Sequence, residues 1–240
     1  MQILIPMAGA GSRFAKVGYS KPKPLIDVDG LPMISRVIDN LGPDNDYIFI
    51  VQKSVLDDYE KDLISATDFA KSSKFLIANG LTEGAAQTCL LAKDSLDMDS
   101  PLMIANCDQI MDWNYDHFYK WFDTTFSDGS IITFSSIEPN NSYVTLREDG
   151  YILEAQEKIV ISDIATTGVY IWRQARDFMV SAEEMISKNI RYNNEFYVCP
   201  VYNQIVEKGK LINVYHIKSH WPIGTPEDLE IYLKHRHERI

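Results

Sequence analysis

Short apolar segments alternate with helical segments along the first 105 residues, and no other feature of this sequence constrains the fold as strongly. The apolar segments at residues 2–6, 47–51 and 101–105 contain too few polar residues for strands with one face in water. Between them, segments such as residues 32–41 place apolar side chains at helical spacing, with a proline in the first turn. Strands joined by helices form a parallel sheet covered on both faces, so we predict the α/β class and a three-layer αβα sandwich.

The second half of the chain departs from this alternation after Asp128-Gly129. Predicted strands at residues 131–137, 143–146 and 151–155 follow one another without helices, which indicates a small antiparallel extension of a mixed, mainly parallel sheet. The other predicted elements are strands at 25–28, 75–78, 169–172 and 211–217, and helices at 55–64, 84–96, 174–186, 199–206 and from 226 onward. No repeat or linker is visible, so we expect a single domain over residues 1–240.

The charge and cysteine content restrict the class of partner. A net charge of −11 argues against the broad basic face that nucleic acid or an anionic membrane requires, although a local cluster of cations can still bind a small anion. The three cysteines are widely spaced and form no C-x-x-C motif, which excludes a zinc cluster and indicates a reducing compartment. No apolar stretch reaches the ~18 residues of a membrane helix, so we expect a soluble, cytoplasmic protein.

A loop of small residues follows the first predicted strand, and a tight group of cations follows the loop. The loop, Ala-Gly-Ala-Gly-Ser at residues 8–12, lies at the sheet edge where open α/β folds bind ligands, and its glycines allow an anion-binding nest of backbone N–H groups. Arg13 adds a planar fork suited to phosphate oxygens. Lys21 and Lys23 follow among prolines that we expect to hold the segment extended. We interpret this stretch as a phosphate site, with a plain turn beside solvated charges as the alternative.

Five segments stand out in chain order: MAGAGSRF…KPKPLIDVDGLPMI, NGLTEGAAQTCLLA, LMIANCDQI, LEAQEKIVISDIATTGVYIW and HWPIGTPEDL. Together they resemble the sugar-phosphate nucleotidyltransferases, a family that includes glucose-1-phosphate thymidylyltransferase and phosphocholine cytidylyltransferase. The resemblance covers nearly the whole chain and implies a Rossmann-like nucleotidyltransferase fold, with a nucleotide-binding half at residues 1–112 and an acceptor-binding half at residues 113–240. It also implies transfer of a nucleotidyl group from a nucleoside triphosphate to a phosphorylated acceptor, with release of pyrophosphate.

The resemblance assigns roles in nucleotide binding to residues of the first half. Arg13 would lie near the β- and γ-phosphates and Lys23 at the reacting centre, while Lys21 would either support it or lie on the surface. Asp108, at the end of a strand, would hold Mg²⁺, a hard ion that prefers carboxylate, phosphate and water oxygens. The residues implied to bind the nucleotide are Ala8, Gly9, Ala10, Gly11, Ser12, Asn79, Gly80, Gly84 and Ala85.

The resemblance also implies an acceptor site in the second half, where Lys158 would bind the phosphate of the acceptor. The implied acceptor-binding residues are Glu157, Lys158, Thr167, Gly168 and Glu195. One departure from the family pattern concerns its closing element, Trp-x-Asp-x-Gly-Thr, whose aspartate is a second metal ligand. Here Trp221 begins the shorter sequence Trp-Pro-Ile-Gly-Thr, and His220 beside it is a minor candidate contact. Either Mg²⁺ is held by Asp108 with phosphate and water oxygens, or a carboxylate from elsewhere in the chain substitutes.

We therefore predict an enzyme that joins a pyrimidine nucleotide to a phosphorylated small molecule. We slightly prefer CTP over UTP or dTTP, because the altered closing element sets this chain apart from the hexose enzymes. The acceptor is a sugar 1-phosphate or a non-sugar such as phosphocholine or phosphoglutamine, for a surface or capsular polysaccharide. The expected partners are the nucleoside triphosphate and the phosphorylated acceptor, without nucleic acid or a membrane. The sequence does not decide whether the protein forms a homo-oligomer.

Two alternatives belong to other classes of protein. The first is a nucleotide-binding regulatory subunit that lost catalysis together with the second aspartate. The second is a nicotinamide-dependent dehydrogenase that uses the glycine loop, but Phe14 occupies the third glycine position of the dinucleotide fingerprint. Release of pyrophosphate separates the enzyme from the regulatory subunit, and binding of NAD would identify the dehydrogenase.

Overall fold

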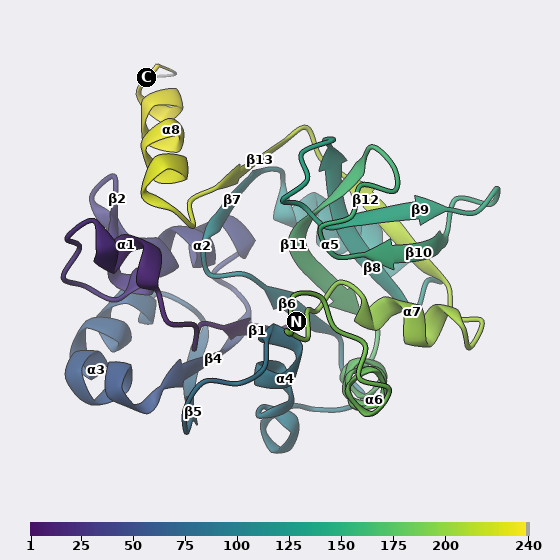
Figure 1. Ribbon diagram of the computed structural model, residues 1–240, viewed down its shortest axis with the longest axis horizontal. Coiled ribbons are helices and arrows are strands. Elements are labelled where there is room, and N and C mark those ends of the chain that lie inside the picture. The colour runs from purple at the N-terminus through teal and green to yellow at the C-terminus, as the bar shows by residue number, and fades with distance from the viewer. Residues whose placement is uncertain (239–240) are drawn as a thin grey trace.

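The computed structural model describes residues 1–238, whose main sheet is mixed and contains nine strands (Figure 1). Its parallel strands are β1 (Gln2–Pro6), β4 (Asp46–Gln52), β5 (Ser72–Ala78) and β6 (Leu102–Ala105). They lie in the order β6-β1-β4-β5, so the chain first winds from β1 toward β5 and then crosses back to the other side of β1. In open α/β sheets such a change of direction marks the place where ligands bind, at the carboxyl ends of the strands.

The sheet continues beyond β6 with β11 (Ile164–Trp172), which runs antiparallel to it. The strands that complete this part are β8 (Gly129–Ser135), β9 (Tyr143–Leu146), β10 (Ile152–Gln156) and β12 (Ile212–His216). Both β8 and β9 pair antiparallel with β11, β10 pairs with β9, and β12 runs parallel to β8. The predicted α/β class, the mixed sheet and its antiparallel extension are confirmed.

Helices cover both faces of the sheet, as uninterrupted apolar strands require. One face is covered by α2 (Met33–Leu41), α3 (Lys53–Thr67) and α5 (Tyr115–Thr124), and the other by α4 (Ala85–Leu90), α6 (Ala175–Ser187) and α7 (Val201–Val206) (Figure 1). In β1, Ile3 and Ile5 face the first group of helices and Leu4 faces the second, because successive strand side chains alternate. Within residues 1–238, no helix is both long enough and apolar enough to cross a bilayer.

The predicted strand at residues 25–28 is too long at its beginning. Residues Lys23–Leu25 form a 3₁₀ turn, because Pro24 has a suitable fixed φ and the missing N–H of a proline costs nothing in a first turn. The strand is thereby reduced to β2 (Asp27–Val28), which pairs with β3 (Leu31–Pro32) in a short hairpin. The prolines therefore do not hold the whole lysine segment extended, as the sequence suggested; they bend the chain at Lys23.

The predicted helix at residues 84–96 is too long. The helix α4 ends at Leu90, and a separate 3₁₀ turn follows at Lys93–Ser95. Gly84 lies outside the helix with a φ of +126°, and a Cβ at this position would lie 2.5 Å from the backbone nitrogen and oxygen of Phe196. Glycine at residue 84 therefore allows two chain segments to approach more closely than any side chain permits.

Three short elements near the carboxyl edge of the sheet were not predicted. They are the helix α1 (Ser12–Lys16) and the strands β7 (Gln109–Asp112) and β13 (Ser219–Pro222). The two strands form an antiparallel ribbon that leads from the end of β6 toward the last helix (Figure 1). Four-residue strands of mixed polarity carry too little periodicity to be recognised in a sequence.

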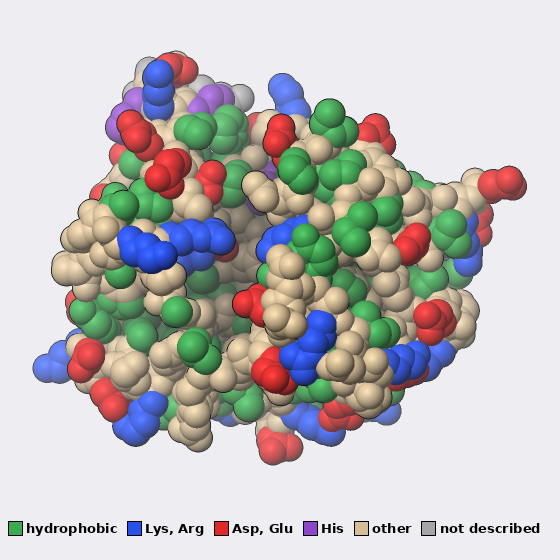
Figure 2. Space-filling view, viewed as in Figure 1, with side chains coloured by type: hydrophobic (Ala, Val, Ile, Leu, Met, Phe, Trp, Pro, Cys, Tyr) green, Lys and Arg blue, Asp and Glu red, His purple; other side chains and the backbone are tan. Residues whose placement is uncertain are grey.

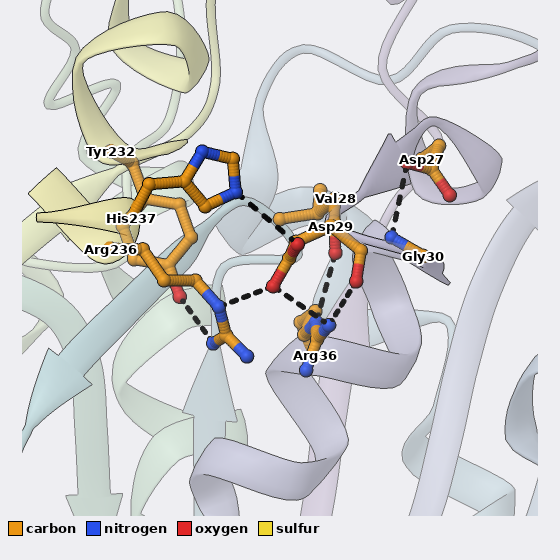
Figure 3. A network of polar contacts seen from close by, with 8 residues as sticks. All are labelled: Asp27, Val28, Asp29, Gly30, Arg36, Tyr232, Arg236 and His237. Atoms are coloured by element: carbon orange, nitrogen blue, oxygen red, sulfur yellow. Dashed lines mark hydrogen bonds and ion pairs between the residues drawn. The ribbon is translucent and has the colours of Figure 1, made fainter. Parts of the chain in front are cut away.

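The last helix, α8 (Pro226–His237), packs on a small third core and is tied to the β2–β3 hairpin by polar contacts (Figure 3). Asp29 in the hairpin turn accepts a hydrogen bond from Arg236, and His237 Nε2 lies 3.5 Å from its other carboxylate oxygen. Arg36 of α2 lies 3.6 Å from the same carboxylate. The hydrogen bond from Arg236, followed by that from His237, holds the pKa of Asp29 below its ordinary value.

We expect Asp29→Asn to lower the melting temperature at pH 7. Asparagine tolerates the left-handed φ of +55°, so the backbone is preserved, but its neutral amide cannot form the ion pairs with Arg236 and Arg36. A carboxyl group with a lowered pKa stabilises the fold above its unfolded pKa, and this contribution is lost as the pH falls through the folded value. The difference from wild type should therefore shrink below about pH 4. Thermal melts between pH 2.5 and 7 measure it. Asp57→Asn, which removes only an exposed ion pair with Lys53, should change the melting temperature less.

Candidate active site

Two cavities adjoin at the carboxyl ends of β1, β4 and β6. The larger has a volume of about 780 Å³ and the smaller about 280 Å³. Asn106 and Asp108, which directly follow β6, line both of them. Figure 2 shows this face hollowed between α1 and the antiparallel part of the sheet, with Lys and Arg side chains on the rim over α1. Both cavities therefore lie at the change of winding direction, where the fold predicts ligand binding.

The predicted phosphate loop and its cations line the larger cavity together. Residues 9–12 contribute the loop, and Arg13, Lys21 and Lys23 contribute positive charge. Gly11 has a φ of +58°, which turns the chain into α1. Ala8 is buried beneath the loop, where its carbonyl accepts a hydrogen bond of 2.7 Å from the Gln52 side chain, and it lines neither cavity.

An ion pair between Lys23 and Asp108 lies where the two cavities meet, and each side chain is about one quarter exposed. Burial lowers the pKa of Lys23, but the adjacent Asp108 carboxylate outweighs it and raises the pKa above its ordinary value. Gly224 packs directly against this pair, since a Cβ there would overlap the Asp108 carboxylate and lie 3.6 Å from Lys23 Nζ. The glycine of the closing element therefore allows the backbone to pack directly against the ion pair.

The donor groups at this point suit a hard cation. Asp108 and Glu195 are the carboxylates that line the larger cavity, and Asn106 adds an amide oxygen. Mg²⁺ prefers such oxygens and usually takes phosphate and water for its other positions. Within residues 1–238, no cluster of three His, Cys, Asp or Glu side chains is close enough to hold a metal alone. Asp108 would thus need oxygens from a ligand or from water to complete the coordination of Mg²⁺, and Glu195 is the carboxylate in the same cavity that could substitute for the missing aspartate.

Buried polar side chains line the smaller cavity. Glu157 is 6% exposed, and its carboxylate accepts a hydrogen bond of 2.5 Å from Ser142. Burial raises the pKa of Glu157, and the hydrogen bond from Ser142 partly offsets that effect. Thr167 and Gly168 line the cavity beside it, and Gly168 has a φ of +84°. The smaller cavity is therefore polar, although the side chains of Glu157, Ser142 and Thr167 are largely removed from water.

Lys158 projects its ammonium group onto two tyrosine rings. Its Nζ lies 4.6 Å from the ring centre of Tyr197 and 5.8 Å from that of Tyr192. The same nitrogen donates a hydrogen bond of 2.9 Å to the Tyr197 hydroxyl and lies 4.0 Å from Glu157. The backbone of Lys158 has a φ of +52°, a strained conformation that such surrounding contacts maintain. The positive charge of the smaller cavity is thus held in one place.

Besides Ala8, five predicted site residues lie elsewhere than the cavity expected for them. Asn79, Gly80 and Gly84, expected at the nucleotide, line neither cavity, and Gly84 packs against the backbone of Phe196. Ala85, also expected at the nucleotide, lines the smaller cavity. Separately, Glu195, expected at the acceptor, lines the larger cavity. The segment at 195–197 packs against the 79–84 loop, since the Phe196 N–H donates a hydrogen bond of 2.7 Å to the Glu83 carbonyl and the Phe196 backbone contacts Gly84.

Sequence reasoning missed several residues that line the smaller cavity. Asn106 and Gln109 flank the predicted metal ligand Asp108, and that proximity was the signal that could have identified them. Tyr197 and His220 also line this cavity, and only His220 had been considered at all. Neither has a local sequence signal, because both reach the cavity through pairings with distant parts of the chain.

The fold and these cavities define a class: an α/β protein with a cationic cavity at the carboxyl edge of its sheet, adjoined by a second polar cavity. A family model described as "nucleotidyl transferase" matches residues 3–232. The chain belongs to this family, which confirms the resemblance seen in the sequence motifs.

Two curated relatives are similar over much of the chain. The bifunctional protein GlmU of Methanocaldococcus jannaschii is 25% identical over 237 residues, which cover 95% of this chain and 52% of GlmU. The mannose-1-phosphate guanylyltransferase catalytic subunit beta of Dictyostelium discoideum is 27% identical over 184 residues, which cover 72% of this chain and 49% of that protein. The chain spans about half the length of the curated relatives it matches.

Solved structures share the fold over almost the entire chain. A nucleoside-diphosphate-sugar pyrophosphorylase from Vibrio cholerae RC9 matches with a TM-score of 0.84 and 25% identity, covering 97% of this chain and 99% of that one. An inositol-1-phosphate CTP transferase from T. maritima matches with a TM-score of 0.75 and 14% identity, covering 97% and 96%. The second likeness supports the fold alone.

Proposed function

We propose that this protein transfers a nucleotidyl group from a nucleoside triphosphate to the phosphate of a small acceptor and releases pyrophosphate. The observation that carries the proposal is the meeting of two polar cavities at Asn106 and Asp108, one lined by cations and the phosphate loop. A phosphate oxygen of the acceptor attacks the α-phosphorus, a new P–O bond forms, and the bond to the β-phosphate oxygen breaks. Such a reaction requires positioning and charge neutralisation of two anions rather than a protein nucleophile.

The larger cavity would hold the nucleoside triphosphate. The loop at residues 9–12 would direct backbone N–H groups to the phosphates, and Arg13 would stabilise the departing pyrophosphate. Lys23 would neutralise charge at the α-phosphate, next to the acceptor cavity. Asp108 would hold Mg²⁺, which neutralises phosphate charge when bound. The half at residues 1–112 supplies these groups, so we propose it as the nucleotide-binding half.

The smaller cavity would hold the acceptor. Lys158 would bind its phosphate, and Glu157, Thr167 and Gly168 would contact the remainder of the molecule. These residues come from the half at 113–240, which we propose as the acceptor-binding half. Since the segment at 79–85 lies outside the larger cavity, its proposed contact with the base requires movement of that loop when the nucleotide binds.

The names of two relatives support a sugar phosphate as the acceptor, since one is a mannose-1-phosphate guanylyltransferase and the other a nucleoside-diphosphate-sugar pyrophosphorylase. The first is named for a guanylyl nucleotide and the second for no particular base, so the preference for CTP among the pyrimidine nucleotides rests on the altered closing element of this chain. A product of this kind, an activated sugar or polyol, is a donor for polysaccharide synthesis, including surface or capsular polysaccharide.

A matrix of substrates tests the proposal. Each of CTP, UTP, dTTP, ATP and GTP is combined with Mg²⁺ and with a panel of sugar phosphates, inositol 1-phosphate, phosphocholine and phosphoglutamine, and pyrophosphate is measured. We expect release with a pyrimidine nucleotide and a sugar or polyol phosphate, and none without an acceptor. Nucleotide binding without pyrophosphate release from any pair would support the regulatory subunit instead.

A further inference from the structure

His220 reaches the smaller cavity from the β7–β13 ribbon. In this ribbon Trp221 pairs with Ile110, and both pack on the third core. Because side chains alternate along a strand, His220 and Gln109 belong to the opposite face, and both line the smaller cavity. The ribbon therefore presents two polar side chains to the acceptor cavity.

The hydrogen bonding of the His220 ring determines which of its nitrogens is free. The backbone carbonyl of Thr167 accepts a hydrogen bond from the ring, while Nε2 is buried and has no partner among the described residues. Since Nε2 is the unpaired nitrogen, we assign the bond to Thr167, and with it the proton, to Nδ1. Burial lowers the pKa of His220 to about 4, so the ring is neutral near pH 7. Nε2 consequently presents a lone pair, which accepts but does not donate a hydrogen bond.

Gln109 supplies the complementary group. Its side-chain Nε2 is also buried without a partner among the described residues, whereas its Oε1 lies 3.5 Å from the Asn106 amide nitrogen. Buried polar atoms without partners are rare in folded proteins, and each indicates a missing water or ligand group. One unpaired acceptor and one unpaired donor on the same wall of a cavity match a hydroxyl group, which both donates and accepts.

We propose that His220 determines acceptor specificity: its Nε2 accepts a hydrogen bond from a hydroxyl group of the acceptor, whose oxygen accepts one from Gln109. This assignment rests on the proposed function, and it narrows the acceptor to a hydroxylated phosphate, a sugar or polyol phosphate. Neutral His220 repels neither an anion nor a cation, so it selects by hydrogen-bonding pattern rather than by charge.

The surroundings of Lys158 exclude the competing class of acceptor. A quaternary ammonium group, as in phosphocholine, is recognised by the open faces of aromatic rings. The Lys158 ammonium lies beside both tyrosines, 4.6 Å from the ring centre of Tyr197, which lines the cavity, and 5.8 Å from that of Tyr192. A second cation there would be repelled by Lys158, so phosphocholine should bind poorly even though its phosphate is acceptable.

Two substitutions distinguish the roles of the two nitrogens of the His220 ring. His220→Asn keeps an amide nitrogen near the position of Nδ1, so it retains the bond to Thr167 and removes only the Nε2 lone pair. His220→Gln places an amide oxygen near the position of Nε2, so it should still accept the hydrogen bond from the hydroxyl group of the acceptor. His117→Asn is the matched control, because His117 lies on α5, is exposed and bonds Tyr215. Thermal melts establish that all three variants fold.

Calorimetry of acceptor binding tests the role of His220 without requiring catalytic turnover. The probes are glucose 1-phosphate, inositol 1-phosphate, phosphocholine and singly deoxygenated analogues of whichever hydroxylated probe binds best. We expect His220→Asn to weaken the best probe about tenfold, and one deoxy analogue to bind wild type about tenfold more weakly. That analogue should bind His220→Asn and wild type equally, while His220→Gln should stay within about threefold of wild type.

Equal weakening of every probe in His220→Asn, or tightest binding by phosphocholine, would overturn the inference. The ¹⁵N resonance of His220 Nε2 gives an independent readout, since it should shift when the hydroxylated probe is added and not when its matching deoxy analogue is added. Failure of the proposed function would look different: the probes would bind with this pattern, yet no nucleotide would yield pyrophosphate with any of them.

Discussion

Replacing Asp108 with asparagine should lower kcat by about 10²-fold or more, the loss expected when a preorganised electrostatic contact is removed. Asparagine has nearly the same shape, so the close packing against Gly224 is preserved. It lacks the charge that pairs with Lys23 and that a hard cation requires. Steady-state pyrophosphate release at saturating nucleotide and acceptor measures the effect, and the Mg²⁺ concentration needed for half-maximal rate should rise.

Asp57→Asn is the matched control for this substitution, because Asp57 forms only an exposed ion pair with Lys53 on α3. It should leave the rate and the Mg²⁺ requirement unchanged. A near-wild-type rate in Asp108→Asn would refute the metal-holding role and would direct attention to Glu195, the other carboxylate of the larger cavity.

Removal of the Lys23 ammonium should have an effect of similar size. In Lys23→Ala we expect kcat to fall by about 10²-fold or more, which corresponds to about 2.7 kcal/mol of transition-state stabilisation. The physical reason is its position, paired with Asp108 where the two anionic substrates would meet. Its raised pKa keeps it charged over the working pH range, so the loss should not depend on pH between 6 and 9.

Lys16→Ala controls for the general loss of positive charge near the phosphate loop. Lys16 lies on α1, is exposed and lines neither cavity, so its removal should leave the rate within about twofold of wild type, as for ordinary surface substitutions. Equal losses of rate in Lys23→Ala and Lys16→Ala would mean that Lys23 acts only through the general positive potential of this surface, and not through a specific contact at the reacting centre. The double variant Lys23→Ala/Asp108→Asn should lose less than the product of the single losses, because the two groups form one unit.

Much of the sheet was predictable because its signals are local. The strands β1, β4 and β6 are apolar without interruption, and that pattern alone requires a parallel sheet covered on both faces. The glycine loop after β1 and the aspartate after β6 could be assigned to one edge, since the carboxyl ends of parallel strands meet there. The structure places residues 9–12 and Asp108 along one cavity, as this reasoning requires.

The errors occurred where tertiary contacts outweigh local preference. Proline suggested an extended segment around Lys23, yet the chain forms a 3₁₀ turn that directs this lysine to Asp108. The helix predicted over residues 84–96 ends at Leu90, and Gly84 lies outside it, where its missing side chain accommodates the backbone of Phe196. In both cases the sequence signal was real and its partner lay too far along the chain to be identified.

Amino-acid order alone was therefore sufficient to predict the class of fold and the family, and to bring the glycine loop and its neighbouring cations to attention, because each depends on residues close together in the chain. The division of side chains between two cavities became visible only in the folded molecule. Lys23 and Asp108 are 85 residues apart, and His220 meets the smaller cavity through a ribbon that pairs residues more than 100 positions apart. Such contacts depend on the complete topology, since no local pattern records which distant strand a segment will join.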